Sequence, residues 1–213
     1  MTKKNKHPAG YFEKILVFDC ETTGLTLNNA DPSIGHQCVS WGMIVADAKT
    51  LKPIEELYVE IKWNKESKEL RKKDPTYGKA AEKIHGLTFT YLEKNGVSEE
   101  EALVQILTLI LKYWGPSSNI RTMGHNGPTF DLPFFRSLLR RHDFKLKFGN
   151  RHIDTSSVGF ITVGSFTSNA LFETMGMAER GEHNALDDAH QALESMRRIR
   201  LFWDKKVQLN AYD

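Results

Sequence analysis

The feature that most constrains this chain is a short apolar run that ends in two acidic residues. Residues 15–18 are Ile-Leu-Val-Phe, a composition typical of a fully buried strand. Asp19 and Glu21 follow, with one residue between them. Because side chains alternate along a strand, both carboxylates are expected on one face of the sheet. Gly24 then allows a tight turn or a close backbone approach to a ligand.

Two like charges at the end of a buried strand repel each other. One of them is driven towards protonation unless a cation neutralises the pair. Hard divalent ions that take oxygen ligands, such as magnesium, suit such carboxylates. The alternative is a strand that runs into a polar turn, where acidic residues are common. The pair therefore indicates a metal site only if further ligands come from elsewhere in the chain.

The length and composition of the chain predict one soluble α/β domain. A chain of 213 residues can bury one sizeable core, and we expect a basic, flexible tail over residues 1–10 and a single domain over residues 11–213. A net charge of +2 permits a polyanionic partner without demanding one. The two cysteines, Cys20 and Cys38, form no disulfide framework and suit the reducing cytoplasm. No apolar run approaches the ~18–20 residues of a membrane helix, so no membrane partner is expected.

The hydrophobic pattern predicts a strand meander followed by alternating helices and strands. Apolar runs at 38–46 and 54–63 predict two strands antiparallel to the first, after a loop over 28–35. The charged segment 64–74 is expected to form a solvated face. Ser98 and Glu101 form a capping box that begins a helix. The remaining expected elements are strands at 120–124 and 151–155 and helices at 132–142, 168–175 and 184–203. This order predicts a mixed sheet with helices packed on its faces.

Two further stretches place acidic residues at helix N-termini. Asp131 stands where the strand at 120–124 gives way to a helix, the sheet edge at which ligands bind in α/β proteins. His183 precedes Asp187 and Asp188 at the start of the last helix. Each set can also be explained as caps that complement the helix dipole. On a helical wheel, Asp188 lies at the edge of the buried stripe, whereas Asp187 points nearly opposite to it.

Taken together, the order and spacing of these motifs are informative. D-x-E on the first strand, H-N-x4-D before a helix and H-x-A-x2-D at the last helix resemble the DEDD exonucleases of the histidine subclass, also called DEDDh or DnaQ-like. The family's signature residues fall on Asp19, Glu21, Asp131, Asp188 and His183. Residues 84–87 (IHGL) and 153–155 (IDT) resemble further family segments, so the resemblance extends from residue 15 to about residue 195.

The resemblance implies a fold, a cofactor and a reaction. The implied fold is ribonuclease-H-like, α/β, with a central mixed five-stranded sheet flanked by helices. The implied reaction is hydrolysis from the 3′ end that releases nucleoside 5′-monophosphates, with two Mg²⁺ or Mn²⁺ ions. The implied metal ligands are the four acids Asp19, Glu21, Asp131 and Asp188, and His183 would take the proton of the attacking water. The implied substrate contacts are Thr22, Thr23, Leu25, His85, Leu87 and Asn126.

The sequence motif at residues 125–133 resembles that of the three-prime repair exonucleases, so single-stranded DNA is expected as the substrate in preference to RNA. Exoribonuclease or oligoribonuclease activity is the alternative within the family. A proofreading subunit or a non-catalytic nucleic-acid-binding subunit of a larger complex is the alternative of another class. The loop at 28–36 is longer than the usual family pattern, and such loops govern substrate choice. The sequence also leaves a homodimer open.

Overall fold

The computed structural model describes residues 13–27, 35–115, 118–177 and 183–210, the last five as backbone only. The expected tail at 1–10 and nearly all of the expected loop at 28–35 lie outside these residues. Among the described helices, none is long and apolar enough to cross a membrane.

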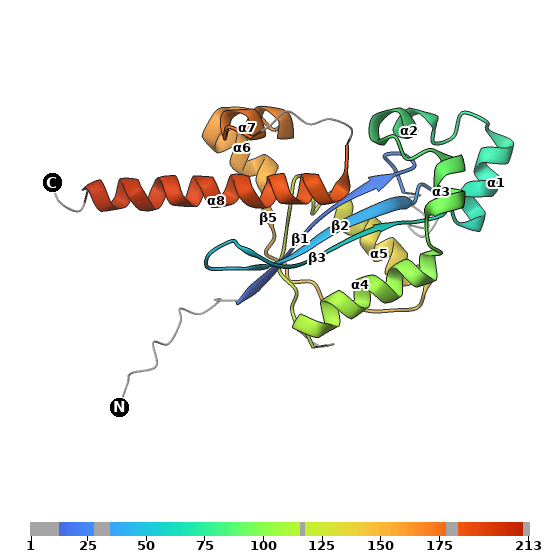
Figure 1. Ribbon diagram of the computed structural model, residues 1–213, viewed down its shortest axis with the longest axis horizontal. Helices are drawn as coiled ribbons and strands as arrows, with labels where there is room; N and C mark the ends of the chain where they lie inside the picture. Colours follow the sequence, from blue (N-terminus) through green and yellow to red (C-terminus); the bar gives the residue numbers. More distant parts are fainter. Residues whose placement is uncertain (1–12, 28–34, 116–117, 178–182, 211–213) are drawn as a thin grey trace.

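Five strands form one mixed sheet in the order β3-β2-β1-β4-β5. The strands are β1 (Lys14–Thr22), β2 (Cys38–Asp47), β3 (Pro53–Glu60), β4 (Thr122–Gly124) and β5 (Ile153–Asp154). β1, β2 and β3 are antiparallel neighbours, whereas β4 runs parallel to β1 and β5 runs parallel to β4. β1 is central because its apolar run is buried on both faces. The mixed five-stranded sheet flanked by helices that the resemblance implied is confirmed (Figure 1).

Eight described helices surround this sheet. They are α1 (Lys65–Lys73), α2 (Lys79–His85), α3 (Phe89–Asn95), α4 (Glu99–Tyr113), α5 (Asp131–Arg141), α6 (Thr155–Val163), α7 (Ser168–Thr174) and α8 (Ala185–Asn210). α4 and α5 cover one face of the sheet and α8 covers the other, as Figure 1 shows. α6 and α7 pack against α8 through a small apolar cluster around Leu171, Phe172 and Ile199.

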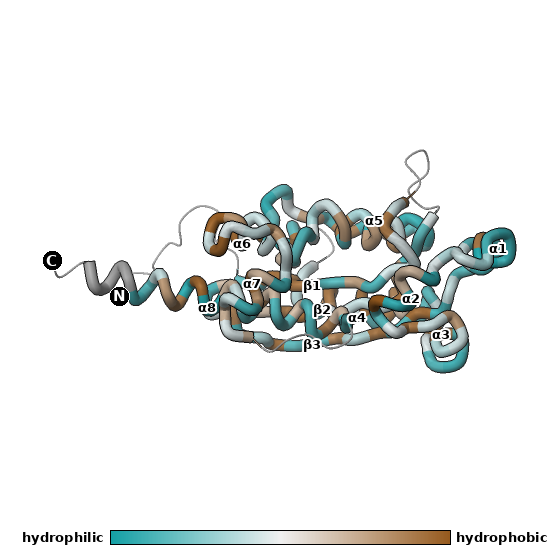
Figure 2. The backbone as a smooth tube through the Cα atoms, turned by 90° about the horizontal axis from the view of Figure 1, so that it is seen from above, coloured by the Kyte–Doolittle hydropathy of each residue, from teal (hydrophilic) through white to brown (hydrophobic). Residues whose placement is uncertain are grey.

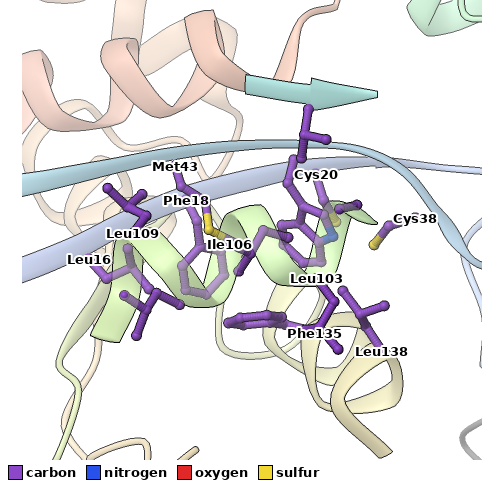
Figure 3. Packing of buried hydrophobic residues seen from close by; sticks show 14 of the residues in the cluster. Leu16, Phe18, Cys20, Cys38, Met43, Leu103, Ile106, Leu109, Phe135 and Leu138 are labelled. Carbon is purple, nitrogen blue, oxygen red and sulfur yellow. The ribbon is translucent and has the colours of Figure 1, made fainter. Parts of the chain in front are cut away.

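The larger core lies between the sheet and the helices α4 and α5. Leu16, Phe18 and Cys20 point into it from β1 (Figure 3). Phe18 packs edge-on against Trp41 and Phe135, with ring centroids 6.0 and 6.2 Å apart. Such aromatic pairs add about 0.5–1.5 kcal/mol each beyond the burial of their area. This face of β1 therefore anchors the sheet to α4 and α5.

Most of the expected elements are present, and the differences lie in short helices that were not expected. The capping box at Ser98 is present, with the Glu101 carboxylate accepting from the Ser98 N–H at 2.9 Å. Residues 65–73, expected only as a solvated face, form α1, which Asn64 caps. α2, α3 and α6 were not expected. α6 is rich in β-branched residues, which favour strands, but the Asp154 side chain accepts a hydrogen bond from the Ser156 N–H and starts a helix instead.

Candidate active site

The far end of β1 directs two carboxylates towards α8. Ile15 and Val17 pack against α8 in the second core cluster. Asp19 and Glu21 continue the same alternation, so they point to the same side of the sheet. Glu21 is buried. The D-x-E pair therefore lies where the apolar contact between β1 and α8 ends.

The start of α8 contributes a third carboxylate. The Asn184 side chain accepts hydrogen bonds from the N–H groups of Leu186 and Asp187 at 3.0 and 3.2 Å, so Asn184 caps this helix. Asp187 is exposed and Asp188 is buried, which confirms the orientation predicted from the helical wheel. Asn184 supplies the cap, and the buried Asp188 lines the same cleft as Asp19 and Glu21.

A glycine on β2 brings α8 this close. Gly42 pairs with Asp19 across the two strands. A Cβ atom on Gly42 would lie 2.2 Å from the backbone of Ala185. The helix start therefore rests directly on the backbone of β2, next to Asp19. The sequence analysis did not identify Gly42, because a glycine within an apolar strand has no distinguishing local pattern.

His183 lies beside these acids at the mouth of the site. Its Nδ1 is 3.5 Å from Oδ2 of Asp188, and its ring is partly exposed. Ligand atoms of Glu21, His183 and Asp188 all lie within 4.8 Å of one another. Two carboxylates and an imidazole at this spacing can share one cation or pass one proton.

Asp131 faces the same site from the opposite side of β1. Its Oδ1 accepts a hydrogen bond from the Cys20 N–H at 2.9 Å, across 111 residues of sequence. Asp131 is the first residue of α5, and the preceding residue, Phe130, makes no side-chain cap. The alternative interpretation of Asp131 as a helix cap is therefore wrong. The carboxylate is held by β1 instead.

The second oxygen of Asp131 is left without a partner. Oδ2 is buried and has no hydrogen bond to any residue that the structure describes. Burial raises the pKa of Asp131 above its ordinary value, and the charge of Asp188 raises it further. An unpartnered buried acceptor costs about 1–3 kcal/mol. A cation in the site would remove this cost, and carboxylate oxygens are the donors that Mg²⁺ and Mn²⁺ prefer.

One cleft of about 700 Å³ joins these groups. The predicted site residues that line it are Asp19, Glu21, Thr22, Thr23, Leu25, His85, Asn126, Asp131, His183 and Asp188. Leu87 does not line it. That side chain is half-buried against the cluster of Val39, Trp63 and Leu92. Thus the structure brings together all of the predicted site residues except Leu87.

The predicted substrate contacts divide into buried and exposed groups. The hydroxyl of Thr22 donates to the Gly24 carbonyl at 2.8 Å, and that of Thr23 accepts from the Gln37 N–H at 3.1 Å. Both threonine side chains are buried, so their hydroxyls serve the turn itself. Leu25, by contrast, is 79% exposed at the edge of the cleft. Asn126 is exposed with a positive φ of 59°, and its N–H donates to Asp154 Oδ1 at 2.8 Å.

The hydrogen bonds of His85 define its tautomer. Its Nδ1 accepts from the Leu87 N–H at 3.0 Å, so the proton is on Nε2, which donates to the Thr22 carbonyl at 3.2 Å. Burial lowers the pKa of His85 below its ordinary value. His85 is therefore a neutral clamp that links α2 to the end of β1.

Several cleft residues were not predicted. Tyr77 stacks on His36 with ring centroids 4.7 Å apart, and both line the cleft together with Ile84, His125 and Phe172. His125 was part of the H-N-x4-D motif, but no role was assigned to it. The others come from elements whose positions follow from long-range packing, so no local pattern marks them.

The sheet order, the covering helices and the cleft of four acids and a histidine define a nuclease domain of the ribonuclease-H-like class. The chain belongs to the exonuclease family: the family model described as "Exonuclease" (RNase T) matches residues 16–196. The family predicted from the motifs is thereby confirmed. A search of curated proteins finds no match.

Solved structures share this fold at low sequence identity. E. coli exonuclease I in complex with a dT13 oligonucleotide superposes with a TM-score of 0.67 and 18% identity over 90% of this chain and 43% of that chain. The nuclease domain of 3′hExo, a DEDDh family member bound to rAMP, gives 0.64 and 14% over 90% and 94%. Exonuclease I from Methylocaldum szegediense gives 0.63 and 20% over 88% and 40%. The chain thus spans less than half the length of these exonuclease I chains.

Proposed function

We propose that this protein is a metal-dependent 3′-to-5′ exonuclease that releases nucleoside 5′-monophosphates from single-stranded nucleic acid. The observation that carries this proposal is the convergence of Asp19, Glu21, Asp131, Asp188 and His183 on one cleft. These five side chains come from three distant parts of the chain, β1, α5 and the start of α8. A complete set of acids also disfavours the non-catalytic binding subunit, which has no need of them.

The four carboxylates suit two divalent cations, Mg²⁺ or Mn²⁺. When bound, the ions neutralise the acids and supply charge stabilisation to the attacking water and to the leaving oxygen. By resemblance to the family, Asp19 would help to hold both ions, and Glu21 and Asp188 would help to hold the first. Asp131 would help to hold the second. Its unpartnered Oδ2 is the structural observation that supports this assignment.

His183 is assigned as the general base. Its Nδ1 faces the Asp188 carboxylate at 3.5 Å, which leaves Nε2 to accept the proton of the attacking water. The carboxylate stabilises the imidazolium that forms. Because the ring is partly exposed at the mouth of the cleft, the proton can then pass to solvent. His183 is not needed as a metal ligand in this assignment.

The terminal nucleotide contacts the far wall of the cleft. Leu25 offers an exposed apolar side chain to its base. By resemblance to the family, Thr22 and Thr23 contribute backbone groups, while their hydroxyls are bonded within the protein. His85 supports this wall from beneath, as does Leu87 indirectly through its hydrogen bond to His85. Asn126 presents its side chain from the opposite edge.

We propose single-stranded DNA as the preferred substrate, because the motif at residues 125–133 resembles that of the three-prime repair exonucleases. One structural neighbour, exonuclease I, is bound to dT13, a DNA oligonucleotide. RNA is the second candidate, because another neighbour, 3′hExo, is bound to rAMP. The two free, buried cysteines accord with a cytoplasmic location. A homodimer remains a prediction.

A digestion ladder tests the proposed function. The protein is incubated with 5′-labelled single-stranded DNA, duplex DNA, RNA and dinucleotides, each with magnesium, manganese or chelator. We expect stepwise shortening from the 3′ end, fastest on single-stranded DNA, and none with chelator. Internal cuts, or shortening in chelator, would contradict the proposal. Faster shortening of matched RNA would move the substrate to the second candidate.

A further inference from the structure

α6 and the link that follows it expose a pair of aromatic rings. Phe160 and Phe166 are 52% and 60% exposed, and Ile161 between them is 82% exposed. The two rings stack in parallel, with centroids 4.5 Å apart and an interplanar angle of 9°. We call these three residues the aromatic platform. Figure 2 shows the strongly hydrophobic colouring of this end of α6.

The local backbone builds the platform as a rigid unit. Gly164 ends α6 with a φ of 75°, a left-handed conformation that suits glycine and turns the chain back. A Cβ on Gly159 would lie 2.9 Å from the Ser165 carbonyl, so the returning link packs tightly on the helix. Phe166 is thereby brought back beside Phe160. The stacked geometry is preformed, which lowers the entropy cost of binding another ring.

A histidine fastens the platform to the wall of the cleft. Nε2 of His125 donates to the Phe166 carbonyl at 2.9 Å, and its Nδ1 bonds the Thr155 hydroxyl at 3.0 Å. His125 itself lines the cleft, as do Ser168 and Phe172 on α7. The platform therefore adjoins the side of the cleft opposite to α2 (Figure 1).

The chemistry of the surrounding segment suits a polyanionic strand. Residues 155–172 contain no charged side chain, although they include seven serines and threonines. The nearest acid before them, Asp154, is engaged by the N–H groups of Asn126 and Ser156. A phosphodiester backbone would thus meet no like charge within this segment, while the bases would meet exposed rings.

We propose that the aromatic platform stacks unpaired bases of the substrate strand upstream of the 3′-terminal nucleotide. This inference rests on the proposed function, because the terminal nucleotide must occupy the cleft. Every base has a π-face, so such stacking is tolerant of sequence but requires a strand without a pairing partner. The platform is thus a determinant of length and strandedness rather than of base identity.

The chain offers a matched control on α8. Phe202 and Trp203 are 56% and 57% exposed, with ring centroids 5.9 Å apart in an edge-on arrangement. Neither lines the cleft. If exposed aromatic rings promoted nucleic-acid binding in general, removal of either pair would have the same effect.

The first test compares substrates of different length. For the double variant Phe160→Ala, Phe166→Ala, the ratio of kcat/KM on an octanucleotide to that on a dinucleotide should fall about tenfold, the effect of one lost base stack. Tryptophan at both positions should restore it. Phe202→Ala should keep the wild-type ratio. An equal ratio in wild type and double variant would overturn the platform.

The second test measures the stacking of bases on the aromatic platform by fluorescence. Oligonucleotides carry 2-aminopurine at the second, third or fourth nucleotide from the 3′ end and are bound with magnesium to the Asp188→Asn variant. Fluorescence should be quenched on binding at one or more of these positions, and the double platform change should relieve that quenching. If quenching is the same with and without the platform, the inference fails and a protein partner becomes the occupant of this face. If the wild type shortens no strand, the proposed function fails, whereas the quenching of a bound strand still decides the platform.

Discussion

The two faces of β1 follow the same alternation but end in different chemistry. On the face towards α4 and α5, the apolar residues Leu16 and Phe18 continue as far as Cys20. On the face towards α8, the apolar residues stop at Val17, and Asp19 and Glu21 follow. One face stabilises the fold and the other carries the reactive groups. The contrast teaches that a strand anchored by apolar packing on one face can hold repelling charges on its other face.

The largest expected effect separates two adjacent acids on the reactive face. Asp188→Asn should lower kcat by a factor on the order of 10⁴, because it removes a carboxylate from the metal site. Asp187→Asn should leave kcat within about twofold, since Asp187 is exposed. Steady-state hydrolysis of a labelled oligonucleotide measures both. The reverse order, with Asp187→Asn inactive, would break the assignment of α8 to the site.

Removal of the proposed base should have the next largest effect. His183→Ala should lower kcat by about 10²- to 10⁴-fold when assayed from about pH 6 to pH 9. Metal affinity, measured by calorimetry, should stay near the wild-type value. A variant with the wild-type rate across this range would exclude His183 from proton transfer.

Substitutions on the two faces of β1 should change the free energy of unfolding in opposite directions. Phe18→Ala should lower the free energy of unfolding by about 3–5 kcal/mol, because it leaves a cavity among Trp41 and Phe135. Asp19→Ala should raise it slightly without metal, because it relieves like-charge repulsion. Urea denaturation in chelator and in magnesium measures both. Magnesium should stabilise wild type more than Asp19→Ala, and equal magnesium shifts would argue against Asp19 as a ligand.

A pH dependence of stability is also expected. Because the folded-state pKa of Asp131 is raised by burial, the folded protein binds more protons than the unfolded chain between the two pKa values. In chelator, stability should therefore fall as pH rises through that window, by at most about 1.4 kcal/mol per pH unit for this group. Denaturant unfolding from acid to neutral pH measures the slope.

Asp131→Asn is the matched control for that slope. Its amide oxygen can still accept from the Cys20 N–H, but the side chain no longer titrates. The variant should lose this part of the pH dependence. An unchanged slope would mean that another group causes it.

The sequence was sufficient to predict side-chain orientation and helix starts wherever the pattern lies within one strand or helix. The alternation along residues 15–21 placed Asp19 and Glu21 on one face, and the helical wheel distinguished Asp188 from Asp187. The capping box at Ser98 located the start of α4. The period of a strand or helix is a property of its own backbone, so these predictions did not need the rest of the fold.

Only the tertiary structure decided the contacts between elements. It showed that Asp131 is held by the backbone of Cys20 rather than acting as a cap, and that Leu87 does not line the cleft. It also showed that α8 reaches Asp19 because Gly42 lacks a side chain. These positions depend on which surfaces meet after the sheet has formed, as between Cys20 and Asp131, which are 111 residues apart. A local pattern contains no information on such contacts, because packing free energy is shared among segments that are distant in the chain.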